Sequence, residues 1–289
     1  MKVDQGALVT SHAMDGPGQQ GHGRPDPALS FAGVADAYDR ARPAYPREAA
    51  GWLVGRPRAR VLELGAGTGK LTDELVGLGH EVVASDPLGA MLGHLVSRHP
   101  RVPAVLAAAE RIPLRARSVD VVVSAQAFHW FDADRALPEI ARVLRPGGHL
   151  ALAWNVRDER VPWVKRLGRL VGPPPARDLD PTHVLLSSHL FGFVEQQTFR
   201  SWQQLDRARL RDLVLSRSNV AVMGQAERDR VLAEVDALYD GYGRGHDGML
   251  LPYVTHCYKA VVRPPAVDED DGPVRDDGGD ADALLIDFS

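Results

Sequence analysis

The sequence predicts an α/β protein built on a doubly wound, mostly parallel sheet. In residues 60–70, RVLELGAGTGK, a short apolar run leads into three alternating glycines and then a helical pattern. Further short apolar or β-branched runs alternate with helical segments up to residue 154. Polar and aromatic residues follow these runs directly, at the strand ends where open α/β sheets bind ligands. The 289 residues suffice for one large domain, or one domain plus a cap.

The predicted elements follow in chain order. Apolar runs predict strands over 61–64, 81–86, 102–107, 118–124 and 150–154, with helices after the first, second and fourth strands. Asp132 is the candidate N-cap of the last of these helices. Two more strands are predicted over 193–202 and 253–262. Two helical patterns lie between them, the first with Asp206 as its N-cap. Helices inserted at the mouth of such a sheet usually shape the substrate pocket, so we expect substrate-cap helices within 159–250. The polar residues 216–219, which include Arg217, lie between the two helical patterns and either reach the substrate or form a polar helix end.

Both ends of the chain differ from this pattern. Residues 1–28 are rich in Gly, Pro and Gln, and residues 264–289 carry many acidic groups among glycines. Such compositions predict a disordered N-terminal extension and a disordered acidic tail. They leave 29–263 as the folded domain. The sequence leaves open whether Met1 or Met14 is the physiological start.

The composition is that of an ordinary globular protein. A net charge of −4 gives no general electrostatic reason to bind nucleic acid. The single cysteine excludes an internal disulfide and a Cys-rich zinc site, and it fits a reducing, cytoplasmic location. No apolar run reaches the length of a membrane span. We therefore expect a small-molecule substrate, no nucleic acid or membrane partner, and a monomer or homodimer.

The glycine-rich loop narrows the class of ligand. A dinucleotide fingerprint needs a third glycine where this chain has Lys70. A P-loop needs its first glycine at the position of Leu64, and Ser or Thr at that of Leu71. The remaining pattern is E-x-G-x-G-x-G, in which Glu63 ends the strand. A carboxylate there suits a cationic ligand better than a pyrophosphate.

The segment 63–69, ELGAGTG, resembles motif I of the class I S-adenosylmethionine (SAM) dependent methyltransferases. Residues 108–114 (AAERIPL), 124–132 (SAQAFHWFD) and 144–148 (LRPGG) resemble later motifs of the methyltransferase type 11 group, in the right order. The resemblance covers about residues 30–263. It implies a Rossmann-like seven-stranded sheet with its last strand antiparallel and a helical cap. It also implies SAM as cofactor and S-adenosylhomocysteine as product.

The resemblance also implies a set of cofactor-binding residues. Asp86 ends the second strand about 20 residues after the glycines, where a carboxylate accepts both ribose hydroxyls; a solvated loop is the alternative. Met91 either packs on adenine or belongs to the core. Many members carry Asp at the position of Ala108, so backbone atoms or Glu110 are expected to meet the adenine. The complete set is Glu63, Gly65, Ala66, Gly67, Thr68, Gly69, Asp86, Pro87, Met91, Ala109, Glu110, Gln126, Tyr38 and Arg42.

The expected chemistry is in-line displacement of the methyl group by an O, N, S or C atom of a small molecule. Tyr38 and Arg42 share a helix face and would meet the methionine carboxylate or the substrate. His129 is the candidate general base, or it only positions a ligand. Trp130 walls the sulfonium or fills the core.

Asn155 and Arg157, which follow the fifth strand, are the other candidate substrate contacts, and no metal is expected. The alternative is a SAM-binding protein without turnover that acts as a partner or regulatory subunit. A nicotinamide-dependent oxidoreductase is disfavoured by the missing glycine at position 70.

Overall fold

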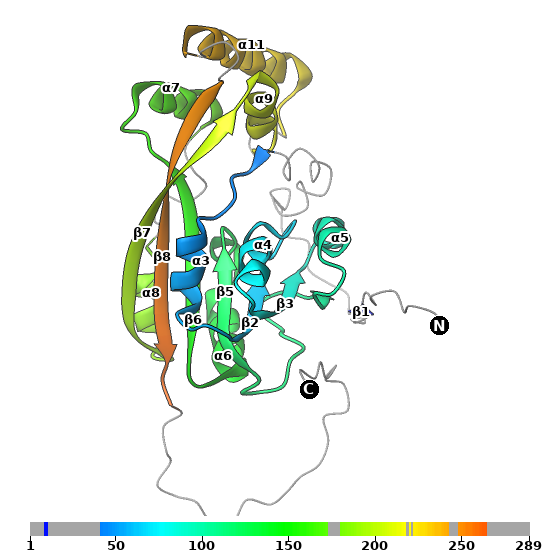
Figure 1. Cartoon of the computed structure of the whole chain (residues 1–289), viewed down its shortest axis with the longest axis vertical. Coiled ribbons are helices and arrows are strands. Elements are labelled where there is room, and N and C mark those ends of the chain that lie inside the picture. Colours follow the sequence, from blue (N-terminus) through cyan, green and yellow to red (C-terminus); the bar gives the residue numbers. More distant parts are fainter. Residues whose placement is uncertain are drawn as a thin grey trace, which may run out of the picture.

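The computed structural model describes residues 9–10, 41–172, 180–217, 220, 222–242 and 248–264. One mixed sheet carries helices on both faces and a group of helices beyond one end (Figure 1). The strands are β1 (Val9–Thr10), β2 (Arg60–Leu64), β3 (Glu81–Asp86), β4 (Ala104–Leu106), β5 (Val119–Ala125), β6 (Leu144–Arg157), β7 (Phe191–Leu205) and β8 (Met249–Val262). The helices are α3 (Arg47–Val54), α4 (Lys70–Gly77), α5 (Gly89–Arg98), α6 (Ala133–Val143), α7 (Pro162–Val171), α8 (Thr182–Ser187), α9 (Arg207–Leu215) and α11 (Gln225–Tyr242), with a 3-10 turn η2 (Phe128–Trp130).

The strand order is β1-β4-β3-β2-β5-β6-β8-β7. From β2 the chain winds outward through β3 and β4, and then returns to the other side of β2 to form β5 and β6. These strands are parallel, and β8 runs antiparallel to both of its neighbours, β6 and β7. The predicted doubly wound sheet with an antiparallel last strand is thus confirmed. Its order reverses between β2 and β5, which is where such sheets bind ligands.

The strand β1 was not predicted. Val9 and Thr10 pair in parallel with Val105 and Leu106 of β4 and add an eighth strand at the sheet edge. The two β-branched residues suit that position. The other residues of the predicted N-terminal extension lie outside the described part of the chain, as do residues 29–40 and 265–289.

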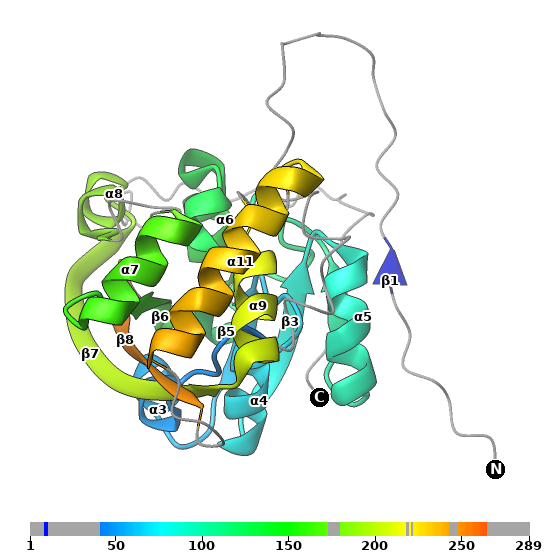
Figure 2. The ribbon, with the colours of Figure 1, turned by 90° about the horizontal axis from the view of Figure 1, so that it is seen from above.

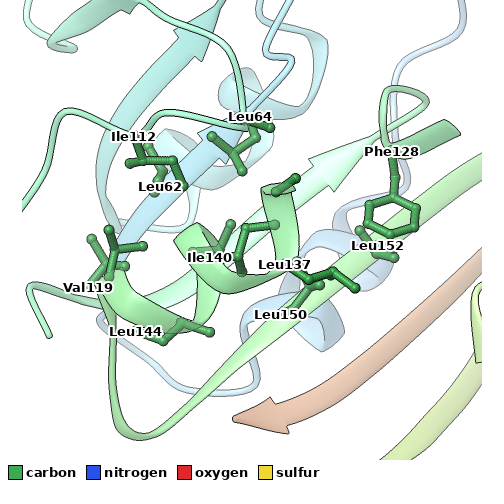
Figure 3. Close-up of a cluster of buried hydrophobic side chains, with 14 of the residues drawn as sticks. Leu62, Leu64, Ile112, Val119, Phe128, Leu137, Ile140, Leu144, Leu150 and Leu152 are labelled. Carbon is green, nitrogen blue, oxygen red and sulfur yellow. The ribbon is translucent and has the colours of Figure 1, made fainter. Parts of the chain in front are cut away.

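Alternating side chains build two apolar layers, one on each face of the sheet. Val121 and Val123 of β5 pack with α3 and α4, while Val122 packs with α6. Helices α3, α4 and α5 cover one face, and α6 and α8 cover the other (Figure 2). Figure 3 shows Leu137 and Ile140 of α6 gathered with leucines of β2 and β6. Burial of both faces is the reason that the strands read as continuous apolar runs.

The cap is formed by α7, α9 and α11, which pack around the ends of β7 and β8 that extend out of the sheet (Figure 1). Its core contains Leu205 and Leu251 from the strands and Leu167, Leu213 and Val235 from the helices. Asp206 caps α9 as predicted, because its carboxylate accepts the backbone N–H of Arg209 at 2.7 Å. Helices α7 and α8 were not predicted. None of the described helices is long and apolar enough to cross a membrane.

Candidate active site

Two of the three glycines in the loop after β2, Gly65 and Gly67, have different structural roles. Gly65, Gly67 and Gly69 all have positive φ, at 69°, 57° and 90°. A Cβ on Gly65 would lie 2.3 Å from the Cβ of Ala127, so this glycine lets the loop after β2 pack against the loop after β5. A Cβ on Gly67 would meet no atom of the described residues within 4 Å. The Gly67 backbone is therefore open to a ligand, whereas Gly65 is needed for packing.

Asp86 joins the glycine loop to the end of β3. Its carboxylate accepts the backbone N–H of Gly67 and that of Leu88, each at 2.8 Å. Burial raises the pKa of this carboxyl, and the two N–H donors oppose that rise. A carboxylate offers about four acceptor positions, so two remain for the neighbouring hydroxyls of a ribose. Asp86 thus supports the glycine loop and is also a suitable acceptor for ribose hydroxyls.

Glu63 lies beneath the loop and is fully buried. The hydroxyl of Thr72 donates to its carboxyl group at 2.6 Å, which fastens β2 to α4. Burial raises the Glu63 pKa to about 8, so the group is mainly protonated at neutral pH. The predicted contact of Glu63 with a cationic ligand stays a prediction.

The loop after β5 brings His129 and Trp130 to the reversal point of the sheet. Neither ring nitrogen of His129 has a hydrogen-bond partner within the described part of the chain, and burial lowers its pKa to about 4. The imidazole is therefore neutral at pH 7 and can donate from one nitrogen and accept at the other. Trp130 is 41% exposed, with its ring centroid 4.7 Å from that of His129. The interpretation of Trp130 as a core residue is wrong, because η2 turns its ring outward.

Glu110 ties the loop after β4 to the start of α6. Its carboxylate accepts the backbone N–H of Asp132 at 2.8 Å. Asp132 occupies the N-cap position of α6, but its side chain makes no capping bond. The predicted capping by this side chain is therefore wrong, and the bond from Glu110 reaches the backbone N–H of the N-cap residue itself rather than those of the first helical turn. Ala109, beside Glu110, is buried, as the close packing of this loop requires.

Four more of the predicted cofactor residues lie near the same strand ends. Ala66 and Thr68 are buried within the glycine loop, Met91 is buried in the first turn of α5, and Pro87 is exposed between β3 and α5. Tyr38 lies outside the described residues. The adenine contact expected of Met91 stays a prediction.

A second group of predicted residues lies where β5 and β6 meet the cap. Gln126, in a strained conformation with φ of 59°, donates from its side-chain amide to the backbone oxygen of Asn155 at 2.9 Å. Asn155 accepts the Thr255 hydroxyl at 2.6 Å and donates to the Ala44 carbonyl at 3.3 Å. These bonds connect β5, β6 and β8 to the segment before α3. They fix the orientation of both amides.

A cavity of about 210 Å³ opens beside these amides, between the sheet and the cap. Its described lining consists of Arg42, Pro43, Gln126, Asn155, Val156, Arg157, Glu159, Leu213, Arg217 and Tyr253. Four of these were predicted site residues: Arg42, Gln126, Asn155 and Arg157. Tyr253 was read only as a strand residue. Arg217 was placed among polar residues between the cap helices, and nothing in its neighbourhood sets it apart from a solvent-exposed helix end.

These features fit SAM. The open Gly67 backbone and the two remaining acceptor positions of Asp86 suit a nucleoside, and the unpartnered His129 nitrogens suit a polar ligand nearby. Both groups lie at the reversal point of a parallel sheet that ends in an antiparallel β8. The fold and this site define a class I SAM-dependent methyltransferase.

Comparison with known proteins agrees with this class. A family model described as a methyltransferase domain matches residues 62–152. An uncharacterized methyltransferase of Mycobacterium tuberculosis is 45% identical over 242 residues, spanning 83% of this chain and 98% of the relative. A methyltransferase-like protein of Schizosaccharomyces pombe is 35% identical, over 80% of this chain and 94% of the relative. The chain belongs to the SAM-dependent methyltransferase family.

A solved structure supports the same assignment. The protein from Anaeromyxobacter dehalogenans, described as a candidate type II methyltransferase, aligns with a TM-score of 0.57 and 29% identity. The alignment covers 77% of this chain and 97% of that chain. The predicted family, fold class and kind of enzyme are confirmed.

Proposed function

We propose that this enzyme binds SAM across the ends of β2, β3 and β5 and methylates a small molecule held in the cavity beneath the cap. The observation that carries the proposal is the Gly67–Asp86 pair. The backbone of Gly67 is open, and its N–H is held by a carboxylate that still has acceptor capacity. The ribose hydroxyls would bond to Asp86, and the sugar would pass close to Gly67.

The protein's contribution to the reaction is mainly positional. When bound, SAM supplies a methyl group on a sulfonium, which is already a good leaving group. An O, N, S or C atom of the acceptor forms the new bond as the carbon–sulfur bond breaks, and the electron pair of that bond goes to sulfur. Holding the two reactants in line replaces a bimolecular encounter by a step within one complex. No nucleophile from the protein takes part.

We infer that His129 would act on the acceptor rather than on the cofactor. As a neutral imidazole it can accept a hydrogen bond or a proton from an acceptor hydroxyl or amine. Its low pKa makes it a weak base, which supports a role in orienting the acceptor over full proton abstraction. An approaching anion would raise that pKa by stabilising the protonated ring.

The test has two stages. Isothermal titration with S-adenosylhomocysteine, on protein freed of any ligand carried through purification, should show binding with a Kd of about 1 μM or tighter, or roughly −8 kcal/mol. Incubation with methyl-labelled SAM and fractionated metabolite pools should then transfer label to a small molecule. Absence of binding would contradict the proposal. Binding without transfer to any pool would instead favour the SAM-binding partner protein.

A further inference from the structure

The charge of this chain is divided between its C-terminal segment and the rest. Residues 265–289 contain nine acidic residues and one arginine. The whole chain has a net charge of −4 and this segment has one of −8, so residues 1–264 together carry +4. Opposite charges attract, so the acidic segment is drawn to any surplus of positive charge that lies close to its point of attachment.

Five exposed arginines lie at the end of the sheet opposite the glycine loop and the cap. The parallel strands begin at that end and β8 finishes there, at the lower end of the sheet in Figure 1. Arg58 and Arg101 precede β2 and β4 by two and three residues, respectively. Arg115 and Arg117 precede β5, and Arg263 directly follows β8. The fold therefore brings together positive charges from four separate segments of the chain.

These five side chains make no hydrogen bond or ion pair with any other part of the chain that the structure describes. Two acids at the same end are already paired with other arginines. Asp120 of β5 lies 3.2 Å from Arg145 and 3.7 Å from Arg56. Glu81, the first residue of β3, lies 3.5 Å from Arg60. These acids therefore do not compensate the five arginines.

The acidic segment is attached beside these arginines. It follows β8 in the sequence, and its first acid, Asp268, is five residues beyond Arg263. Neighbouring strands lie about 4.8 Å apart, so β2 is about 14 Å and β4 about 24 Å across the sheet from β8. A flexible chain spans about 20 Å over the 14 residues from Arg263 to Asp277. The attachment thus keeps the acids close to the arginines.

We propose that the acidic segment 268–282 docks on these five arginines within the same molecule and neutralises this end of the sheet. The inference is independent of the proposed methyltransferase function. A single exposed ion pair contributes little, but the covalent attachment gives a high effective concentration, about millimolar for short flexible linkers. Several weak pairs can then form at once. Salt should weaken the contact, because the screening length falls from about 10 Å at 0.1 M to about 3 Å at 1 M.

The test measures paramagnetic relaxation by NMR in the full-length protein. A nitroxide is attached to Gly279→Cys, which lies among the acids, whereas the natural Cys257 is buried. The matched control has the same label and chain length, with every Asp and Glu of 268–282 changed to Asn or Gln. At about 50 mM salt, broadening of the Arg58 and Arg101 backbone amides should be at least about twofold stronger in the acidic protein. At about 1 M salt the two proteins should be equal.

Charge changes elsewhere in the chain locate the docking surface. A first variant removes three of the five charges: Arg58→Gln, Arg101→Gln and Arg115→Gln. It should reduce the broadening to that of the neutral control. A second variant removes three exposed charges from α7 in the cap: Lys165→Gln, Arg166→Gln and Arg169→Gln. It changes the net charge equally and should leave the broadening unaltered.

Three results would overturn the proposal. Equal broadening by the acidic and the neutral segment would show that the acids do not dock. Broadening that requires a mixture, with the nitroxide on one molecule and the isotope label on another, would show that a second copy supplies the segment. Binding of a short DNA duplex to the unmodified protein, lost in the first arginine variant, would assign the surface to an external polyanion.

Discussion

Gly67→Ala should produce a folded protein that no longer binds the cofactor well. Within the described part of the chain the new methyl group would have no atom within 4 Å, so the disturbance expected there is the positive φ of 57°. A left-handed conformation costs a residue with a Cβ about 1–2 kcal/mol. For a domain of this size, that corresponds to a fall in melting temperature of about 2–8 °C. In the complex, however, the methyl group would occupy space that the nucleoside needs.

The expected loss of affinity follows from overpacking. Forcing one extra carbon into a close-packed contact costs about 1–3 kcal/mol, which raises Kd for S-adenosylhomocysteine by about 5- to 150-fold. The matched control is Gly79→Ala, because Gly79 has a φ of 86°, has the same open surroundings and lies after α4, away from the site. It should lose similar stability but bind normally. Calorimetry and thermal unfolding on both variants provide the measurements. Normal binding by Gly67→Ala would refute the assignment of the loop.

Four further predictions follow from the same contacts. Gly65→Ala should lower the melting temperature more than Gly67→Ala does, because its Cβ would lie 2.3 Å from Ala127; equal stability of the two would contradict the packing argument. Asp86→Ala should weaken S-adenosylhomocysteine binding by about 1–3 kcal/mol in calorimetry, with exposed Asp134→Ala unchanged. Neutral Glu63 stabilises the fold fully below its ordinary pKa of 4.5, and this contribution is lost as the pH rises through about 8. In the wild type, the free energy of unfolding measured in urea should therefore fall by up to about 1.4 kcal/mol per pH unit between pH 4.5 and about 8. Glu63→Gln should remove this slope, and an unchanged slope would exclude Glu63 as its source. Once a substrate is found, the pH profile of kcat/KM should show no ionisation of His129 between pH 6 and 8, because the pKa of His129 lies near 4. A change in kcat/KM centred near pH 6.5 that disappears in His129→Ala would contradict this prediction.

The sheet could be predicted because each of its strands carries its own signal. Runs such as Val121 to Val123 are buried on both faces of the sheet, so nearly every position is apolar. Such a strand can be recognised from the sequence alone. The glycine loop and Asp86 could also be predicted, because they lie directly after strands. Ligands of open α/β sheets bind at these strand ends. Helix α7 was missed although its apolar residues face the cap core, because the pattern after residue 159 is short and ends beside prolines.

The cavity could be predicted only in part. Arg42, Asn155 and Arg157 follow or precede recognisable motifs, but Arg217 and Tyr253 reach the site through long-range packing of the cap on the sheet. Trp130 was misjudged as a possible core residue because a large aromatic side chain beside a strand is usually buried, whereas the turn η2 directs this ring outward. The expected side-chain cap of α6 is also absent. Asp132 occupies the N-cap position, but its side chain makes no capping bond, and the long-range bond from its backbone N–H to Glu110, 22 positions earlier in the chain, has no signal in the local sequence.

The length of β7 and β8 determines how the cap can behave mechanically. Thirteen residue pairs join the two strands, from Phe191 with Val262 at the sheet to Leu205 with Met249 in the cap. The same ribbon thus contributes to the sheet through Tyr258 and to the cap core through Leu251. Rotating the cap as a separate body would require breaking or strongly bending this ladder. We therefore expect the cap and the sheet to move together, so that the volume beneath the cap limits the size of an acceptor.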